Sequence, residues 1–176
     1  MILKTARLTL KPQVGEDAAD LFAILRDAEA MHFWNRPPIT RLEVVEELVS
    51  EQLSVAAAGV CRYWTAWEGA DAIGSVDLSL IQDGSAELGF LFRRDRWGLG
   101  LASEAAGAVA AHATGPLGLK RLASAIQAEN RAAARVLEKT GFAMVDRRSV
   151  TIASGESRDC AFYLLVRDQS ASAKGR

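Results

Sequence analysis

Residues 93–113 read RRDRWGLGLASEAAGAVAAHA: three arginines lead into two glycines and then into an alanine-rich segment of helical character. Gly98 and Gly100 allow the backbone to approach a ligand closely. The first-turn amides of a helix beginning near Leu101 have no partners within the helix, and such a helix start attracts anions, above all phosphate. Arginine side chains suit phosphate oxygens. The stretch therefore predicts a phosphate or pyrophosphate site, with a glycine-rich turn bearing solvated arginines as the alternative.

The better-known phosphate motifs do not match this loop. The Walker pattern requires Gly-Lys-Ser/Thr, which is absent. The dinucleotide fingerprint fails because Ser103 stands at its third glycine, and because the loop follows a hairpin late in the chain instead of opening a βαβ unit. A nucleotide-binding protein is therefore a weak alternative.

The segments around the loop predict an α/β protein. A strand-like stretch at 5–12 precedes an amphipathic helix within 15–30, and a second helix follows Pro37 and Pro38 and runs to about Val55. Next come three strand-like segments (61–68, 72–81 and 86–92), a helix (101–113), a strand (121–128), a helix (130–140) ended by Gly141, and a hairpin around 153–156. This order predicts a mixed sheet with helices on its faces. We expect one domain over 1–168 and a disordered tail at 169–176.

Composition limits the classes of function. With 176 residues, 49% of them hydrophobic, the chain can bury roughly 70% of its unfolded surface as one domain. Its 21 basic and 22 acidic side chains give no reason to expect nucleic-acid or membrane-surface binding. Cys61 and Cys160 form no C-x-x-C pair, which favours ordinary thiols in a reducing compartment. The N-terminus lacks a signal-peptide core, so we expect a cytoplasmic protein.

The ordered set of segments resembles a known family. The matching stretches are LKTARLTLKP and EDAADLFAILRDAEAM at the start, IGSVDL and AELGFLF in the middle, WGLGLASEA at the loop, and ENRAAARVLEKTGF and FYLLVRD near the end. Together they resemble the GNAT superfamily of acetyl-CoA-dependent N-acetyltransferases, in particular the branch of ribosomal-protein N-terminal alanine acetyltransferases. The resemblance covers nearly the whole chain and implies a central, mostly antiparallel sheet that is splayed at the cofactor site, with helices on both faces.

The resemblance also implies a set of cofactor-binding residues. The family's glycine signature corresponds to Trp97, Gly98, Leu99, Gly100, Leu101 and Ala102, whose backbone amides would hold the pyrophosphate of coenzyme A. Trp97 departs from the general superfamily pattern but is familiar in this branch. The splayed strand would offer backbone groups of Phe90, Leu91 and Phe92 to the pantetheine arm, as in strand augmentation. Asn130 would bind the cofactor's amide region, with a plain helix cap as the alternative.

Acetyl transfer to an amine needs a proton acceptor, and the resemblance assigns this role to Glu87. Glu87 is the acid of AELGFLF and lies on the strand face opposite Ala86 and Leu88. An unremarkable glutamate at a sheet edge is the alternative.

The proton donor to the departing thiolate is in doubt. The branch usually carries Asn-x-x-Ser, whereas this chain has Ala133 at the serine position, and a methyl group cannot donate a proton. Water, Tyr63 or Tyr163 would have to substitute, although Tyr163 is better explained as a core aromatic. G-x-S-x-G and H-E-x-x-H motifs are absent, His32 and His112 are better explained by packing or solvent exposure, and no metal site is predicted.

The sequence does not identify the acceptor amine. Phe33, Trp34, Tyr63 and Trp64 would line an acceptor slot or pack in the core. A protein N-terminal amine, a polyamine and an aminoglycoside are competing acceptors, and a catalytically weak acetyl-CoA sensor is the alternative from another class. Homodimers are common in the family, but the sequence carries no signature of dimerisation.

Overall fold

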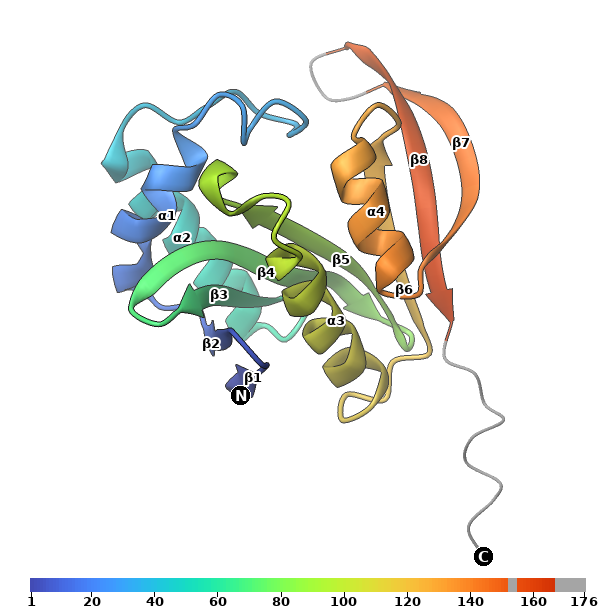
Figure 1. The fold of residues 1–176 in the computed structure, drawn as a ribbon, viewed down its shortest axis with the longest axis horizontal. Coiled ribbons are helices and arrows are strands. Elements are labelled where there is room, and N and C mark those ends of the chain that lie inside the picture. The colour runs from blue at the N-terminus through green and yellow to red at the C-terminus, as the bar shows by residue number, and fades with distance from the viewer. Residues whose placement is uncertain (152–154, 167–176) are drawn as a thin grey trace, which may run out of the picture.

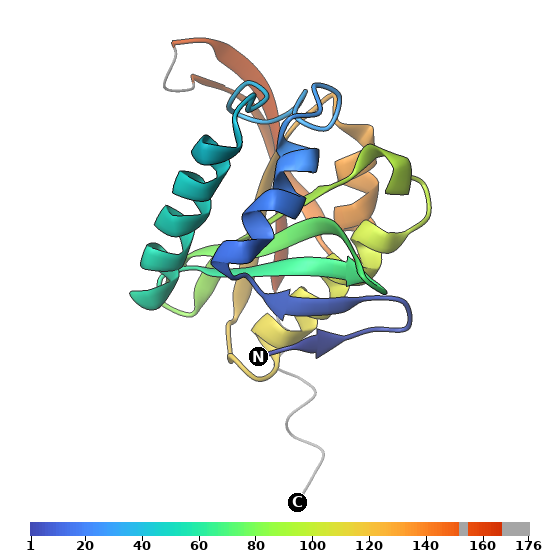
Figure 2. The same cartoon turned by 90° about the vertical axis from the view of Figure 1, so that its left-hand side faces the viewer.

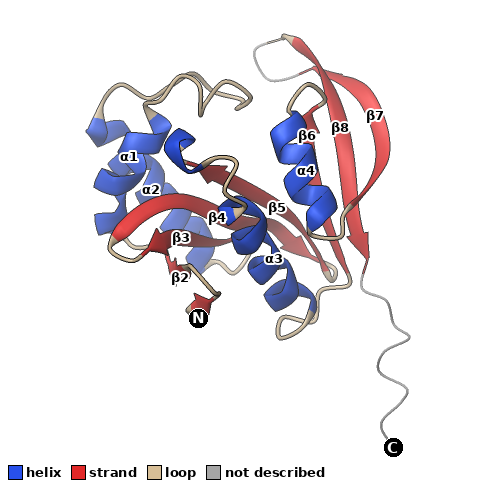
Figure 3. Cartoon of the chain, in the orientation of Figure 1, coloured by secondary structure: helices blue, strands red, loops and turns tan. Residues whose placement is uncertain are grey.

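The computed structural model describes residues 1–151 and 155–166, which form a mixed eight-stranded sheet in the order β1-β2-β3-β4-β5-β6-β8-β7 (Figures 1 and 3). The strands are β1 (Leu3–Lys4), β2 (Thr9–Pro12), β3 (Arg62–Glu68), β4 (Asp71–Gln82), β5 (Ser85–Phe92), β6 (Arg121–Gln127), β7 (Ala143–Thr151) and β8 (Ser157–Val166). The helices are α1 (Ala18–Leu25), α2 (Leu42–Ala57), α3 (Leu101–Thr114) and α4 (Arg131–Lys139), with short 3-10 turns at Gly15–Asp17 and Arg94–Arg96. The predicted α/β class and element order are confirmed.

Helices cover both faces of the sheet (Figure 2). On one face, Val76 and Leu78 of β4 join Ala106 and Val109 of α3 in the main core. On the other face, α1 and α2 form a second core, which Leu91 of β5 enters. Because successive strand residues point to opposite faces, β5 contributes to both cores, with Leu88 in the main core and Leu91 in the second.

The sheet is splayed between β5 and β6, as the resemblance implies. These two strands run parallel and pair over three positions, from Ser85 with Arg121 to Glu87 with Ala123. Beyond that point the Ser124 hydroxyl donates a buried hydrogen bond of 2.9 Å to the carbonyl of Leu88. The remainder of β5 therefore runs on without a partner strand on its β6 side, which leaves backbone groups free there.

Two predictions fall wholly or partly outside the described residues. The turn of the last hairpin was expected around 153–156, of which 155 and 156 are described. The tail at 169–176 lies outside the described residues, so its disorder stays a prediction. Within the described residues, no helix is long and apolar enough to cross a membrane.

Candidate functional site

The glycine loop forms an open backbone cradle at the start of α3. Gly98 and Gly100 have φ values of +76° and +78°, a conformation that favours glycine. The amide of Glu104 donates to the carbonyl of Gly100 at 3.0 Å, closing the first turn of α3. The amides before Glu104 lie in the part of the helix that has no intrahelical acceptor, so they remain available to an anion.

The loop is held from both sides. The Trp97 indole donates to the carbonyl of Phe92 at 2.9 Å, which ties the loop to the end of β5. From the N-terminal hairpin, Arg7 donates to the carbonyl of Leu99 at 2.9 Å and forms an ion pair of 2.6 Å with Glu104 of α3. These bonds use outward-facing groups of the loop and leave the amides at the start of α3 free.

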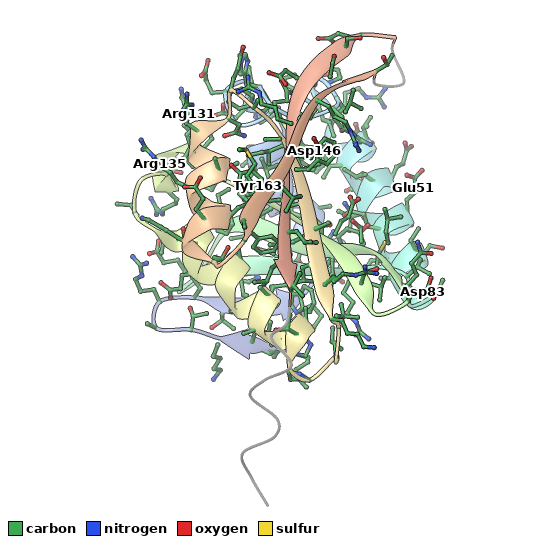
Figure 4. All side chains as sticks on the ribbon, turned by 90° about the vertical axis from the view of Figure 1, so that its right-hand side faces the viewer. Glu51, Asp83, Arg131, Arg135, Asp146 and Tyr163 are labelled. Atoms are coloured by element: carbon green, nitrogen blue, oxygen red, sulfur yellow. The ribbon has the colours of Figure 1, made fainter. Side chains whose placement is uncertain are left out.

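The arginines before the loop do not all face the site, contrary to the simplest interpretation of the sequence. Each one is held in an ion pair: Arg93 with Asp95 at 2.7 Å, Arg94 with Asp27 at 3.5 Å, and Arg96 with Glu68 at 3.0 Å. Of the three, Arg96 lines the cavity described below, and it is joined there by Arg135 and Lys139 of α4. In Figure 4, Arg131 and Arg135 project from the side of α4 that lies away from β7. Much of the positive charge therefore comes from α4.

A cavity of about 670 Å³ runs from the glycine loop to the gap between β5 and β6. Nine of the predicted cofactor residues line it: Phe90, Leu91, Phe92, Trp97, Gly98, Gly100, Leu101, Ala102 and Asn130. The structure does not bring Leu99 or Glu87 into the lining. The sequence interpretation missed Ser103, Ser124 and Gln127, and also Arg135 and Lys139. The lysine and arginine could have been found by their spacing of one helical turn on α4.

The backbone of β5 offers its free groups in an alternating pattern. The carbonyls of Leu88 and Phe92 accept from Ser124 and Trp97, so they point away from β4. The amide of Arg93 instead donates to Ile73 of β4 at 2.8 Å. Alternation then directs the backbone of Phe90 into the gap and that of Leu91 toward β4.

Asn130 acts as a helix cap and also lines the cavity. Its side-chain oxygen accepts from the amide of Ala133 at 3.0 Å, so the capping alternative is realised. The amide nitrogen of the side chain is not used by this bond. The methyl group of Ala133 lines the same stretch of the cavity, where it offers no proton.

An acidic group that the sequence interpretation missed lies at the other end of the cavity. Asp77 of β4 lines the cavity and is half-buried, and desolvation together with the nearby negative charge of Glu87 raises the pKa of its carboxyl to about 7. Glu87 itself is exposed. One signal in the sequence could have pointed to Asp77, an acid between the apolar residues Val76 and Leu78. The groups that surround this acid depend on strand register and cannot be read from the sequence.

Two of the four predicted acceptor-site aromatics line the cavity. Phe33 and Trp34 lie in the segment after α1, and their carbonyls accept from Gln127 at 2.9 Å and from Arg158 at 2.8 Å. These bonds join the segment to β6 and β8 across the mouth of the cavity. Trp64 instead packs in the main core, and its indole donates to the carbonyl of Met1.

The remaining candidates lie apart from the cavity lining. Tyr163 is buried in the main core, under α4, and burial raises the pKa of its hydroxyl (Figure 4). Desolvation and the neighbouring Cys61 raise the pKa of Tyr63 as well, so neither phenol is disposed to ionise. His112 is buried edge-on against Trp64. Cys61 and Cys160 are free thiols, and the described residues contain no cluster of three or more potential metal ligands.

Comparison with known proteins identifies the family. The model of the acetyltransferase (GNAT) domain matches residues 7–143. The chain belongs to the GNAT acetyltransferase family. Among curated relatives of this acetyltransferase, the uncharacterized N-acetyltransferase p20 of Bacillus licheniformis is 27% identical over 144 residues, which cover 80% of this chain and 81% of the relative.

Solved structures agree with this acetyltransferase in fold. RimL, described as a ribosomal L7/L12 alpha-N-protein acetyltransferase in complex with coenzyme A, superposes with a TM-score of 0.85 at 16% identity and covers 94% of this chain and 98% of its own. The ribosomal-protein-S5-alanine acetyltransferase of Vibrio fischeri gives a TM-score of 0.83 at 16% identity, with 96% and 98% covered. At these identities the likeness concerns the fold. The chain is thus an N-acetyltransferase of the GNAT family, and GNAT enzymes act on amines.

Proposed function

We propose that this acetyltransferase moves the acetyl group of acetyl-CoA directly to a primary amine, and that a protein or peptide N-terminal α-amine is its acceptor. The observation that carries the proposal is a single cavity with free helix-start amides and cations at one end, unpaired β5 backbone in the middle and a carboxylate at the other end. This order corresponds to a phosphate group, an amide-containing arm and an amine.

The residues fit coenzyme A by several independent features. The left-handed glycines keep side chains away from the α3 amides, which would hold the pyrophosphate. Arg96, Arg135 and Lys139 would balance phosphate charge. Phe90 would bind the pantetheine amides through its backbone, with the neighbouring Leu91 and Phe92 shaping the channel. The unused nitrogen of the Asn130 side chain would donate to a carbonyl of the same arm. Acetyl-CoA supplies the activated acyl group when bound.

Glu87 enters this proposal with a reduced role. It lies on the same face of β5 as Gly89 but is exposed and absent from the cavity lining. It would act on the amine only through water, or as a negative charge near the site. Protonation of the departing thiolate falls to water, because Ala133 supplies no hydroxyl.

Two observations support an N-terminal α-amine as the acceptor. The coenzyme A-bound neighbour RimL is an α-N-protein acetyltransferase by description, and the apolar side chains of Phe33 and Trp34 beside Asp77 suit a short peptide end. Polyamines and aminoglycosides are the competing small-molecule acceptors.

The test is release of free thiol from acetyl-CoA with a panel of amines: peptides beginning with Ala, Ser or Met, polyamines, aminoglycosides and free amino acids. Saturable release with the α-amine peptides is expected. Tight coenzyme A binding with no release on any amine would favour the sensor alternative. Release confined to polyamines or aminoglycosides would overturn the N-terminal acceptor.

A further inference from the structure

Asp77 lies at the centre of β4 and lines the cavity at a position other than the expected base, Glu87. Register places it between Tyr63 of β3 and Gly89 of β5. Its chain neighbours Val76 and Leu78 are fully buried in the core under α3, so the Asp77 side chain points to the opposite face of the sheet, which α1 and α2 cover. An acid at this position is therefore separated from the main core and directed to the acceptor side of the sheet.

The carboxylate lies directly over the backbone of Gly89. A Cβ atom added to Gly89 would be 2.5 Å from one Asp77 carboxylate oxygen and 3.1 Å from the other. Gly89 does not belong to the glycines with positive φ, so its backbone conformation gives no reason for glycine. What the absent side chain provides is space. The pair of residues brings an acid onto the floor of the cavity beside Leu88, where β5 leaves β6.

Within residues 1–151 and 155–166, this carboxylate has no hydrogen-bond or ion-pair partner. Among the described residues, no side chain or backbone group donates a hydrogen bond to it, and it is in no ion pair, whereas the buried Asp17 on the same side accepts from Thr65 at 2.6 Å. Half-buried acids without partners are costly to keep ionised. An unpaired acid that faces a cavity is suited to a cationic ligand or to a proton.

The charged and titratable groups around Asp77 come from several elements. Tyr63 comes from β3, Cys61 immediately precedes that strand, Glu87 comes from β5, and Asp17 from the turn before α1. Glu29 of the segment after α1 and Arg158 of β8 line the same cavity. The α2 residues that face the sheet are the apolar Val45 and Val49. Desolvation and the charge of Glu87 raise the pKa of Asp77 to about 7. A group that titrates there can take up a proton and release it near neutral pH.

We propose that Asp77 is the catalytic base, the group that receives the protonated acceptor amine and removes its proton. This inference rests on the proposed function. The ammonium group of the acceptor gives one proton to the Asp77 carboxylate, and the neutral nitrogen attacks the thioester carbon of acetyl-CoA. The new C–N bond forms, the C–S bond breaks, and the second nitrogen proton passes through water to the departing thiolate. The products are the N-acetyl amide, coenzyme A and protonated Asp77, which then releases its proton to water.

The same chemistry favours an acceptor class. An α-amine has a pKa near ~8 and a lysine-like or polyamine nitrogen near ~10.4. Transfer of a proton to a group that titrates at about 7 is then disfavoured about tenfold for the α-amine and about 10³-fold for the alkylamine. This smaller pKa gap, together with the apolar Phe33 and Trp34 that line the same cavity, favours an N-terminal α-amine as acceptor, with Glu87 acting on Asp77 as a neighbouring charge.

The test compares Asp77→Asn and Glu87→Gln with wild type on the best α-amine acceptor found. Asp77→Asn should lower kcat by about 10² to 10⁴-fold, the usual contribution of a general base, with an unchanged dissociation constant for coenzyme A. Glu87→Gln should lower kcat less than tenfold and shift the acidic limb of the kcat profile to lower pH. Formate should restore part of the activity to Asp77→Ala, which a merely structural role would not explain.

The failures of the two proposals are distinguishable. A wild-type protein that binds coenzyme A and acetylates no amine refutes the proposed function. A wild-type protein that is active, with Asp77→Asn equally active or with a hundredfold loss in Glu87→Gln alone, refutes the role of Asp77. Loss of coenzyme A binding in Asp77→Asn would show that the residue maintains the folded structure, and would also refute the proposal.

Discussion

The two ends of the cavity hold their charges in different ways. At the glycine loop, three cations line the cavity beside backbone amides whose direction is set by Gly98, Gly100 and the first turn of α3. At the β4 end, Asp77 lies over Gly89 and has no partner among the described residues. The first end is built from one continuous stretch and a nearby helix, whereas the second exists only because two strands pair in one register. The proposed phosphate site is therefore largely local in sequence, and the proposed base is not.

The largest expected effect after loss of Asp77 itself comes from Gly89→Ala. The added methyl group would meet the Asp77 carboxylate at 2.5 Å, so the acid must move from the cavity floor. We expect kcat to fall by about 10²-fold, as for a misplaced base, with coenzyme A affinity nearly unchanged. The matched control is Gly15→Ala, where an added Cβ meets nothing within 4 Å. Full activity in Gly89→Ala would contradict the assignment of this end of the cavity.

Gly100→Val should disrupt phosphate binding at the glycine-loop end of the cavity. A β-branched residue at φ +78° is strained, and the backbone can no longer present the amides at the start of α3 to phosphate. We expect coenzyme A to bind about tenfold or more weakly, roughly the loss of one charge-assisted hydrogen bond, in a titration by calorimetry. Gly118→Val is the control, because Gly118 also has positive φ but lies outside the cavity lining. Equal weakening in both variants would point to a general loss of stability.

Arg135→Gln should weaken coenzyme A binding by a smaller factor. Arg135 lines the cavity, whereas Arg131, one turn earlier on α4, is outside the lining and provides the control as Arg131→Gln (Figure 4). We expect coenzyme A to bind about three- to tenfold more weakly. This difference from wild type should be smaller at high salt, because the contact is partly solvated. The measurement is the dissociation constant of coenzyme A at two salt concentrations. Equal effects from the two arginines would remove Arg135 from the site.

A separate expected effect is on the pH dependence of stability and not on binding or activity. The folded pKa of Asp77, about 7, lies above its ordinary value of 3.8, so the native protein binds more protons than the unfolded chain between these values. Wild-type stability therefore falls as pH rises from about 4 to about 7, and Asp77→Asn does not share this loss. We expect Asp77→Asn to be more stable at pH 8 by roughly 1–3 kcal/mol, allowing for solvent in the cavity, and nearly equal at pH 4. Thermal unfolding at both pH values measures the difference. An Asp77→Asn variant that is less stable than wild type at pH 8 would contradict the conclusion that burial of the charged carboxylate destabilises the native protein.

The sequence predicted the fold well, because its determinants are local. Alternation in 86–92, the glycines of the loop and the Asn130 cap each depend on residues within a few positions of one another. The first two occur as expected, and the cap is the alternative given for Asn130. The element order and the family resemblance then led to nine of the eleven predicted site residues in the cavity lining. The resemblance also assigned the base to Glu87, the acid of its own strand, and this role stays a prediction.

Strand register and helix placement decided what the sequence could not. The mixed sheet, the left-handed glycines and the exposed helix-start amides follow from the sequence, since backbone conformation and hydrophobic period act over short distances. Three features instead depend on how the chain folds: Arg93 and Arg94 are engaged in ion pairs away from the cavity lining, Arg135 and Lys139 line it in their place, and Asp77 lies over Gly89. Asp77 and Gly89 are brought together by cross-strand pairing, and the desolvation that raises the pKa of Asp77 arises only when the helices close over the sheet.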